Sequence, residues 1–350
     1  MTFTLVAFHA HPDDETLLTG GTLARAAAEG HRVVLVTATL GESGLSAGPT
    51  GALLGERRHR ELLAAATALG CARVETLGYL DSGLVAPVYG EISHSAGPGG
   101  WSADSRPTDT PGDGPADGTR STDAAGDRPP DGTRSTDAAG DRPPDGMRFA
   151  DAPGDGPADG TRFADAPVDE AAARLAAILR EERADVLTGY DPRGGYGHPD
   201  HVQVHRVAAA AARLAGTPVL LEATVDRAAL RPALAALRLA GRLLPSLPLG
   251  GAATAFTARA DITHVVDVRA YGPQKRAAMR AHASQGEGGG VRTLALLSRL
   301  PGPLFRAVAG REWFVEVGRA PGPKPCGDIF ETVRRARSET DHRSRPASRP

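Results

Sequence analysis

The chain has 350 residues, a net charge of −2, 41% hydrophobic residues and only 4% aromatic residues. That size and composition allow a large core built mainly from Leu, Val and Ala. The balanced charge, with no basic stripe, argues against nucleic acid as a partner. The two cysteines, Cys71 and Cys326, form no Cys-x-x-Cys pair, so we expect neither a disulfide framework nor a thiolate metal site.

The first part of the chain alternates apolar runs with helical patterns. Strands are expected at 4–8, 32–39 and 73–77, and helices at 21–30 and 55–70. The N-terminus lacks the pattern of a signal peptide, and no apolar run is long enough to span a membrane. The sequence therefore predicts a cytoplasmic protein that does not enter a membrane.

A low-complexity segment interrupts this alternation. Copies of a 14-residue unit begin at Asp117, Asp131, Asp145 and Asp159, and the second copy repeats the first, D-G-T-R-S-T-D-A-A-G-D-R-P-P. Because Gly, Pro, Asp, Arg, Ser and Thr leave almost nothing to bury, residues 97–167 are expected to be a disordered insertion. Solenoid repeats would carry an apolar face in every unit, so that architecture does not fit.

The alternation resumes after the insertion. The pattern predicts helices at 168–182 and 199–214 and strands at 185–189 and 218–221, followed by helices at 227–249 and 274–285 and strands at 263–268 and 312–317. We expect one α/β catalytic domain made of residues 1–96 and 168–336, with a frayed tail at 337–350. Continuous apolar strands between helices indicate a mostly parallel sheet with helices on both faces.

Two clusters of ionisable residues follow predicted strands. The first is H-A-H-P-D-D-E-T at residues 9–16, and the second is Y-D-P-R-G-G-Y-G-H-P-D-H at 190–201. Parallel strands place their carboxyl ends at one edge of the sheet, where such proteins build their sites. The two loops bring to that edge seven candidate side chains: His11, Asp13, Asp14, Glu15, His198, Asp200 and His201.

These residue types suit metal-assisted amide hydrolysis. Two neutral imidazoles and a carboxylate form a zinc site that leaves one position for water. A further carboxylate can take the proton of that water, and a spare histidine can stabilise the oxyanion or protonate the leaving amine. Either cluster by itself could instead be a capped helix N-terminus with structural histidines. Two clusters at one sheet edge favour a site.

Two further histidines adjoin the clusters. His9 directly follows the predicted strand at 4–8, and we expect it to be structural. His205 lies one turn beyond His201 and could be a ligand on geometry, although a packed or supporting role is favoured.

The paired motifs resemble the PIG-L/LmbE zinc deacetylases. A-H-P-D-D-E (10–15) and G-H-P-D-H (197–201) carry the resemblance, supported by T-L-G-E-S-G (39–44), R-R-H-R-E-L (57–62), L-D-S-G-L (80–84) and A-H-A-S-Q (281–285). The resemblance covers about residues 3–96 and 165–320. The resemblance implies a Rossmann-like α/β fold. It also implies hydrolysis of an N-acetyl group on an amino sugar, which is a small-molecule substrate.

Residue roles follow from the same resemblance. It implies His11, Asp14 and His201 as metal ligands, Asp13 as general base and His198 as the group that stabilises the oxyanion and aids amine departure. Tyr196 matches a tyrosine that helps to bind the carbonyl oxygen. Arg58 and Asp81 match positions that contact the substrate. Zinc is the expected metal, and iron(II) could occupy the same nitrogen and oxygen ligands.

Several alternatives stay open at this point. The motifs are most similar to the mycothiol-pathway subgroup, which includes both an N-acetylglucosaminyl-inositol deacetylase and a mycothiol conjugate amidase, and an antibiotic-sugar deacetylase is a further possibility. H-A-H-P-D-D also resembles the H-x-H-x-D-H signature of dinuclear metallo-β-lactamases, with Asp14 where that signature has His. A sugar-binding or scaffold module without catalysis would need no general base. The oligomeric state is left open.

Overall fold

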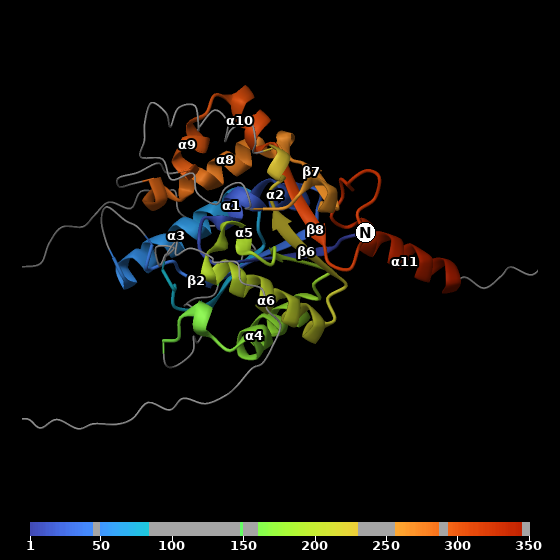
Figure 1. Cartoon of the computed structure of the whole chain (residues 1–350), viewed down its shortest axis with the longest axis horizontal. Helices are drawn as coiled ribbons and strands as arrows, with labels where there is room; N and C mark the ends of the chain where they lie inside the picture. Colours follow the sequence, from blue (N-terminus) through green and yellow to red (C-terminus); the bar gives the residue numbers. More distant parts are fainter. Residues whose placement is uncertain (45–49, 84–147, 150–159, 230–255, 287–292, 345–350) are drawn as a thin grey trace, which may run out of the picture. The chain divides into compact units, whose positions relative to one another are not determined.

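The apolar run near the N-terminus forms β1 (Thr4–His9), the central strand of an eight-stranded sheet (Figure 1). The computed structural model describes residues 1–44, 50–83, 148–149, 160–229, 256–286 and 293–344. The strand order is β4-β3-β2-β1-β5-β6-β8-β7. The parallel strands flanking β1 are β2 (Arg32–Thr39), β3 (Arg73–Tyr79), β4 (Arg148–Phe149), β5 (Val186–Tyr190) and β6 (Val219–Thr224).

The last two strands reverse direction. β8 (Arg311–Glu316) pairs with β6 and β7 (His264–Asp267) pairs with β8, both antiparallel. The fold class is therefore the expected α/β arrangement with a mostly parallel sheet. The predicted strand at 32–39 and the predicted helix at 168–182 have the observed bounds.

Helices cover both faces of this sheet (Figure 1). On one face α2 (Gly20–Ala28), α3 (Ala52–Leu69) and α8 (Gly272–Ala281) pack together. On the other face α4 (Val168–Glu182) packs against α6 (Pro199–Ala215). The shorter helices are α1 (Asp14–Leu18), α5 (Gly194–Gly197), α9 (Thr293–Arg299) and α10 (Gly302–Ala309), and α11 (Glu331–Ser344) ends the described chain. Single 3₁₀ turns lie at Phe163–Asp165, Arg259–Asp261, Arg269–Tyr271 and Ala283–Gly286.

The strand order creates one switch point, between β1 and β5. From β1 the chain builds outward through β2 and β3, and it then returns to the other side of β1 with β5 and β6. The loops after β1 and β5 therefore leave the same edge in opposite directions and open a crevice between them. Aliphatic side chains such as Val6, Leu35 and Leu187 fill the core beneath, each with no exposed surface.

The structure describes parts of the segments that the sequence assigns to the insertion and the tail. Residues 160–167 belong to the folded unit: Phe163 is fully buried and its amide donates to Leu80 O at 2.8 Å. Ring packing between Phe163 and Phe8 supplies the apolar contact that the repeat composition concealed. The predicted tail begins inside α11, whose Arg337 pairs with Asp185. Apart from β4, the rest of the repeat array lies outside the described residues, as do most of the predicted 227–249 helices.

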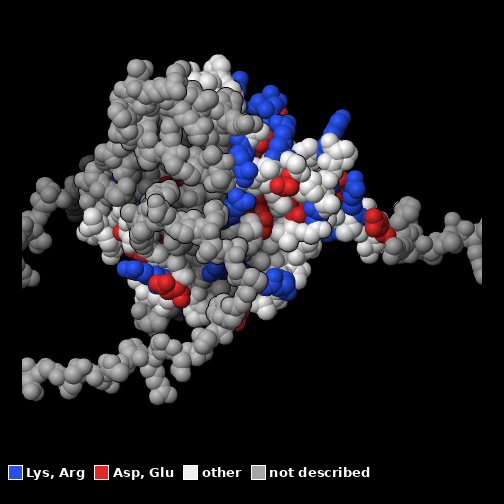
Figure 2. All heavy atoms as spheres, in the orientation of Figure 1, with Lys and Arg blue, Asp and Glu red and all other residues white. Residues whose placement is uncertain are grey.

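Figure 2 shows basic and acidic side chains close together on the described part of the face in view. Among the described residues, no helix combines the length and the apolar character needed to cross a membrane.

Candidate active site

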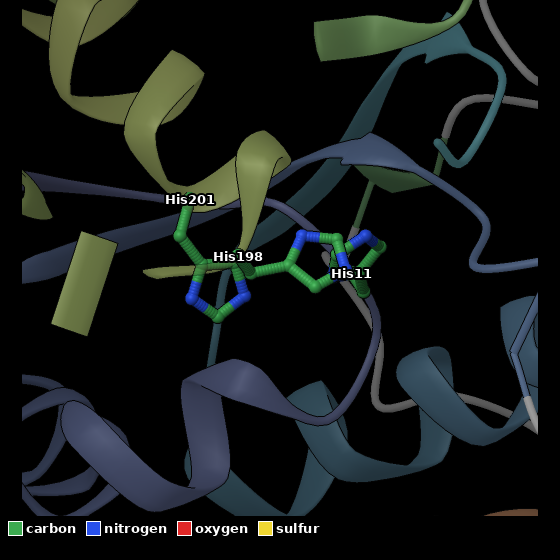
Figure 3. Close-up of side chains that lie close together, drawn as sticks. All are labelled: His11, His198 and His201. Carbon is green, nitrogen blue, oxygen red and sulfur yellow. The ribbon is translucent and has the colours of Figure 1, made fainter. Parts of the chain in front are cut away.

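The two ionisable clusters meet at the switch point. His11 comes from the loop after β1, whereas His198 and His201 come from the start of α6, which follows β5 (Figure 3). The ring centroids of His11 and His198 lie 4.8 Å apart, those of His11 and His201 5.6 Å, and those of His198 and His201 5.1 Å. All three side chains are buried. The structure thus brings the predicted histidines from both clusters to one point.

Local sequence explains how α6 presents its histidines. Pro199 occupies the first turn, where its missing N–H costs nothing, and His198 caps the helix by accepting the amide of Asp200 at Nδ1, 3.1 Å away. Gly194 has φ 61°, and a Cβ there would lie 2.7 Å from the Cβ of His201. Glycine is required at 194 because any side chain would displace that histidine.

Carboxylates surround the imidazole of His11. Its Nε2 lies 3.0 Å from Asp200 Oδ2 and 3.3 Å from Asp81 Oδ1, and its Nδ1 lies 3.4 Å from Asp14 Oδ2. Burial by itself would lower the pKa of His11, but the hydrogen bonds to Asp14, Asp200 and Asp81 outweigh it and raise that pKa well above its usual value. The surroundings of His11 therefore favour positive charge.

The donor set fits a metal ion. Asp14 Oδ2 lies within 3.4 Å of His11 Nδ1 and 3.3 Å of His201 Nε2. His201 Nε2 is buried and makes no hydrogen bond of ordinary geometry within the described part of the chain. Ligand atoms of His11, His198 and His201 lie within 4.8 Å of one another, as do those of a second group, His11, Asp81, His198 and Asp200. A nitrogen and oxygen set of this kind suits zinc or iron(II).

Asp13 lies beside this cluster in an unusual backbone conformation. Its φ is 113°, which is rare for a residue with a side chain. Burial and the charge of Asp14 outweigh the opposing charge of Arg58 and raise the pKa of Asp13 to about 6. A carboxylate of that pKa can exchange protons near neutral pH, as a general base must.

His198 is held in one tautomer. Because Nδ1 accepts the amide of Asp200, the proton of the neutral ring is on Nε2. Burial, together with the charges of His11 and His201, lowers the pKa of His198 to about 4. The neutral ring can donate a hydrogen bond from Nε2 to an oxygen in the site.

The other predicted site residues lie around the same centre. Tyr196 keeps 59% of its surface exposed and has its ring 5.0 Å from that of His201. Arg58 is buried, donates to Pro12 O at 3.1 Å and lies 3.7 Å from Asp13 Oδ2. Asp81 accepts from the amides of Ser43 and Gly83 as well as lying against His11. Protein groups thus occupy both Arg58 and Asp81, and their contact with a substrate stays a prediction.

An apolar cavity adjoins the cluster. It has a volume of about 260 Å³ and borders Asp14, His201 and Tyr196. Its walls are mainly apolar side chains from several elements, among them Leu17, Val225, Met279, Leu297, Val308 and Trp313. The histidine cluster therefore has an apolar cavity on the side of Asp14 and His201. The carboxylates of Asp81 and Asp200 contact His11 and do not line this cavity.

Sequence reasoning gave no role to several residues that support the site. Asp200 bonds His11 and accepts from both the amide and the hydroxyl of Ser82, so it ties the loop after β3 to α6. Glu15 is fully buried against His282, with Oε1 2.6 Å from Nε2. The sequence motifs D-S-G (81–83) and A-H-A-S-Q (281–285) contain the partners Ser82 and His282. Only the tertiary structure shows that these partners contact Asp200 and Glu15.

His9 and His205 both contact groups next to the histidine cluster. His9 is fully buried, with Nδ1 2.8 Å from the Tyr190 hydroxyl and Nε2 3.0 Å from the Thr19 hydroxyl. His205 pairs with Glu222 at 3.1 Å, and its Nδ1 contacts the carbonyl of Tyr190.

We expect His9 to make the metal-free protein less stable in acid. Burial lowers the pKa of His9 to about 4, below the 6.5 of an exposed histidine. Between these values the unfolded chain binds a proton that the folded chain does not, so acidification favours unfolding by up to about 3 kcal/mol. Urea unfolding of the metal-free chain at pH 7 and pH 4.5 measures this loss.

The matched variant is His9→Gln, which cannot titrate. The raised pKa values of His11 and His282 act with the opposite sign, stabilising the fold as pH falls, and they are common to both proteins. The informative quantity is therefore the difference between wild type and variant. Equal losses of stability in the two proteins would contradict the assignment to His9.

Comparisons with known proteins agree with this geometry. Residues 6–212 match the family described as "PIG-L: GlcNAc-PI de-N-acetylase". A relative from Streptomyces avermitilis, named 1D-myo-inositol 2-acetamido-2-deoxy-alpha-D-glucopyranoside deacetylase, is 34% identical over 364 residues, covering 94% of this chain and 97% of its own. A relative of the same name from Thermobispora bispora is 32% identical, with 91% and 89% covered.

Among solved structures, the conserved protein TT1542 from Thermus thermophilus is similar with a TM-score of 0.46 and 20% identity, covering 95% of this chain and 99% of its own. The family match includes both loops that form the histidine cluster, since it extends from β1 through most of α6. With the family match over more than half of the chain and relatives above 30% identity over nearly all of it, this chain belongs to the PIG-L family of de-N-acetylases.

Proposed function

We propose that this deacetylase hydrolyses the acetamide of 1D-myo-inositol 2-acetamido-2-deoxy-α-D-glucopyranoside, giving acetate and the free amine. The observation that carries the proposal is the meeting of His11, Asp14 and His201 beside the partly buried carboxylate of Asp13. The substrate is taken from the relatives, whose alignments cover nearly the whole chain. A mycothiol conjugate amidase or an antibiotic-sugar deacetylase would use the same chemistry on other groups.

His11, Asp14 and His201 are the proposed metal ligands. The approach of Asp14 Oδ2 to both His201 Nε2 and His11 Nδ1, at 3.3 Å and 3.4 Å, supports this set. Zinc bound there would lower the pKa of a coordinated water and polarise the acetamide carbonyl.

The remaining groups carry the protons and the developing charge. Asp13 takes a proton from the attacking water, and Arg58, 3.7 Å from its carboxylate, helps to hold it. His198 donates from Nε2 to the carbonyl oxygen as negative charge develops, with the Tyr196 hydroxyl as second donor. The C–N bond then breaks, and the amine nitrogen takes up the proton that Asp13 removed. The acetyl methyl faces the apolar cavity beside Asp14 and His201.

An assay that measures both acetate and newly released amine tests the substrate. The purified full-length chain is assayed with N-acetylglucosaminyl-inositol, a mycothiol conjugate, N-acetylglucosamine and a glycosylated antibiotic. We expect the highest kcat/KM with the inositol compound. Faster cleavage of the mycothiol conjugate would make the chain an amidase, and tight sugar binding without acetate release would make it a binding module.

Metal removal tests the cofactor. Dialysis against a chelator should abolish turnover, and one equivalent of zinc, or of iron(II) without oxygen, should restore it. Elemental analysis should then find one metal ion per chain. Full activity in the chelated protein would refute the metal assignment, and two ions per chain would favour the dinuclear alternative.

A further inference from the structure

The A-H-A-S-Q segment (281–285) contacts the site from the end of α8, far along the chain from either histidine loop. His282 is 1% exposed and Ser284 is fully buried. Each contacts one carboxylate, His282 that of Glu15 and Ser284 that of Glu61. The proposed chemistry uses neither carboxylate. Their function must therefore lie in the other groups that they bind.

Glu15 joins His282 to the backbone of Asp13. His282 Nε2 lies 2.6 Å from Glu15 Oε1, while Glu15 Oε2 accepts the amide of Asp13 at 2.9 Å. The φ of 113° at Asp13 is unfavourable for any residue with a Cβ, and such conformations persist only where surrounding contacts enforce them. The carboxylate of Glu15 supplies such a contact, and His282 fixes the carboxylate.

Glu61 joins Ser284 to the helix that carries Arg58. The amide and hydroxyl of Ser284 donate to Glu61 at 2.9 Å and 2.6 Å. Glu61 lies three residues after Arg58 on α3, so both extend from one side of that helix. Arg58 in turn donates to Pro12 O at 3.1 Å and lies near the Asp13 carboxylate. Glu61 itself pairs with Arg57 at 3.2 Å, so the second contact anchors α3, the helix that carries Arg58, the partner of Asp13.

We propose that His282 and Ser284 form a positioning clamp that holds Asp13 and Arg58 toward the histidine cluster through Glu15 and Glu61. The proposal rests on the proposed function insofar as Asp13 is the general base. Neither clamp residue belongs to the proposed ligand set. Breaking the clamp should misplace the base and leave substrate affinity and metal content largely intact.

The kinetic test replaces His282 in the full-length protein. For His282→Leu we expect kcat to fall about 10- to 100-fold, the range found when residues that orient a metal site are lost. KM should change less than about threefold, since the clamp touches no proposed substrate contact except through Arg58. His282→Gln, whose amide can donate to Glu15 from a similar position, should recover most of the activity.

A matched control separates positioning from general damage. His264 is also fully buried, but it lies in β7 beside Thr263 and Glu316, and His264→Leu should keep kcat near that of wild type. An unchanged kcat in His282→Leu, or an equal fall in His264→Leu, would overturn the clamp. A loss of metal that fully accounts for the lost activity would do so too.

A second readout is independent of catalysis. In the metal-free protein, hydrogen exchange of a peptide containing the Asp13 amide should be faster in His282→Leu than in wild type or His264→Leu. Unchanged exchange would contradict the clamp even if the wild type released no acetate, an outcome that would refute only the proposed function. If His282→Leu does not fold, Ser284→Ala, which removes one hydroxyl, provides the same test through kcat at constant KM.

Discussion

Replacing Asp13 with Asn should lower kcat/KM by a factor of about 10²–10⁴, the contribution typical of a positioned general base. Asn has nearly the shape of Asp and tolerates positive φ better than most residues, so the φ of 113° can be kept. The variant cannot take the proton of the attacking water. Steady-state acetate release measures the loss, and elemental analysis should show that the metal is retained.

Two further variants serve as controls for Asp13→Asn. Asp14→Ala removes a proposed ligand, so it should lose both metal and activity, whereas Asp13→Asn should lose activity only. Asp169→Asn, exposed on α4, should behave as wild type. Undiminished hydrolysis by Asp13→Asn would refute the assignment of the base.

Replacing Lys275 with Met should destabilise the fold by about 3–5 kcal/mol, as expected when one partner of a buried ion pair is removed. The side chains of Lys275 and Glu312 are 2% and 1% exposed, and Nζ lies 2.6 Å from Oε1. Glu312 also accepts the amides of Gly21 and Thr22 at the start of α2. Without Lys275, the negative charge of Glu312 would stay buried with only these two backbone amides as donors. Urea unfolding measures the change.

The double variant Lys275→Met/Glu312→Leu tests the cause. It removes both charges, so part of the lost stability should return even though two amides lose their acceptor. The exposed pair of Arg269 and Asp267 is the matched control, and Arg269→Met should change stability little. A Lys275→Met variant as stable as wild type would show that the pair contributes nothing.

The fold and the cluster at its centre could be predicted because their signals are local. An apolar run such as 32–39 favours a buried strand, and the helical crossover between β1 and β2 returns the chain parallel to β1. Since parallel strands end at one edge, the H-P-D motifs had to meet there. The contacts of Phe163 and Arg337 had no such signal, because their partners, Phe8 and Asp185, lie far away along the chain.

From its residues and their order, the sequence by itself determined the α/β class, the sheet edge that carries the site and the residue types that meet there. Only the tertiary structure decided which carboxylates surround His11 and that β8 runs antiparallel. It also decided that His282 and Lys275 bond to Glu15 and Leu17, each more than 250 positions earlier in the chain. The physical reason is that strand and helix signals depend on neighbouring residues. A buried polar group, in contrast, must find its partner wherever packing brings one within hydrogen-bond distance.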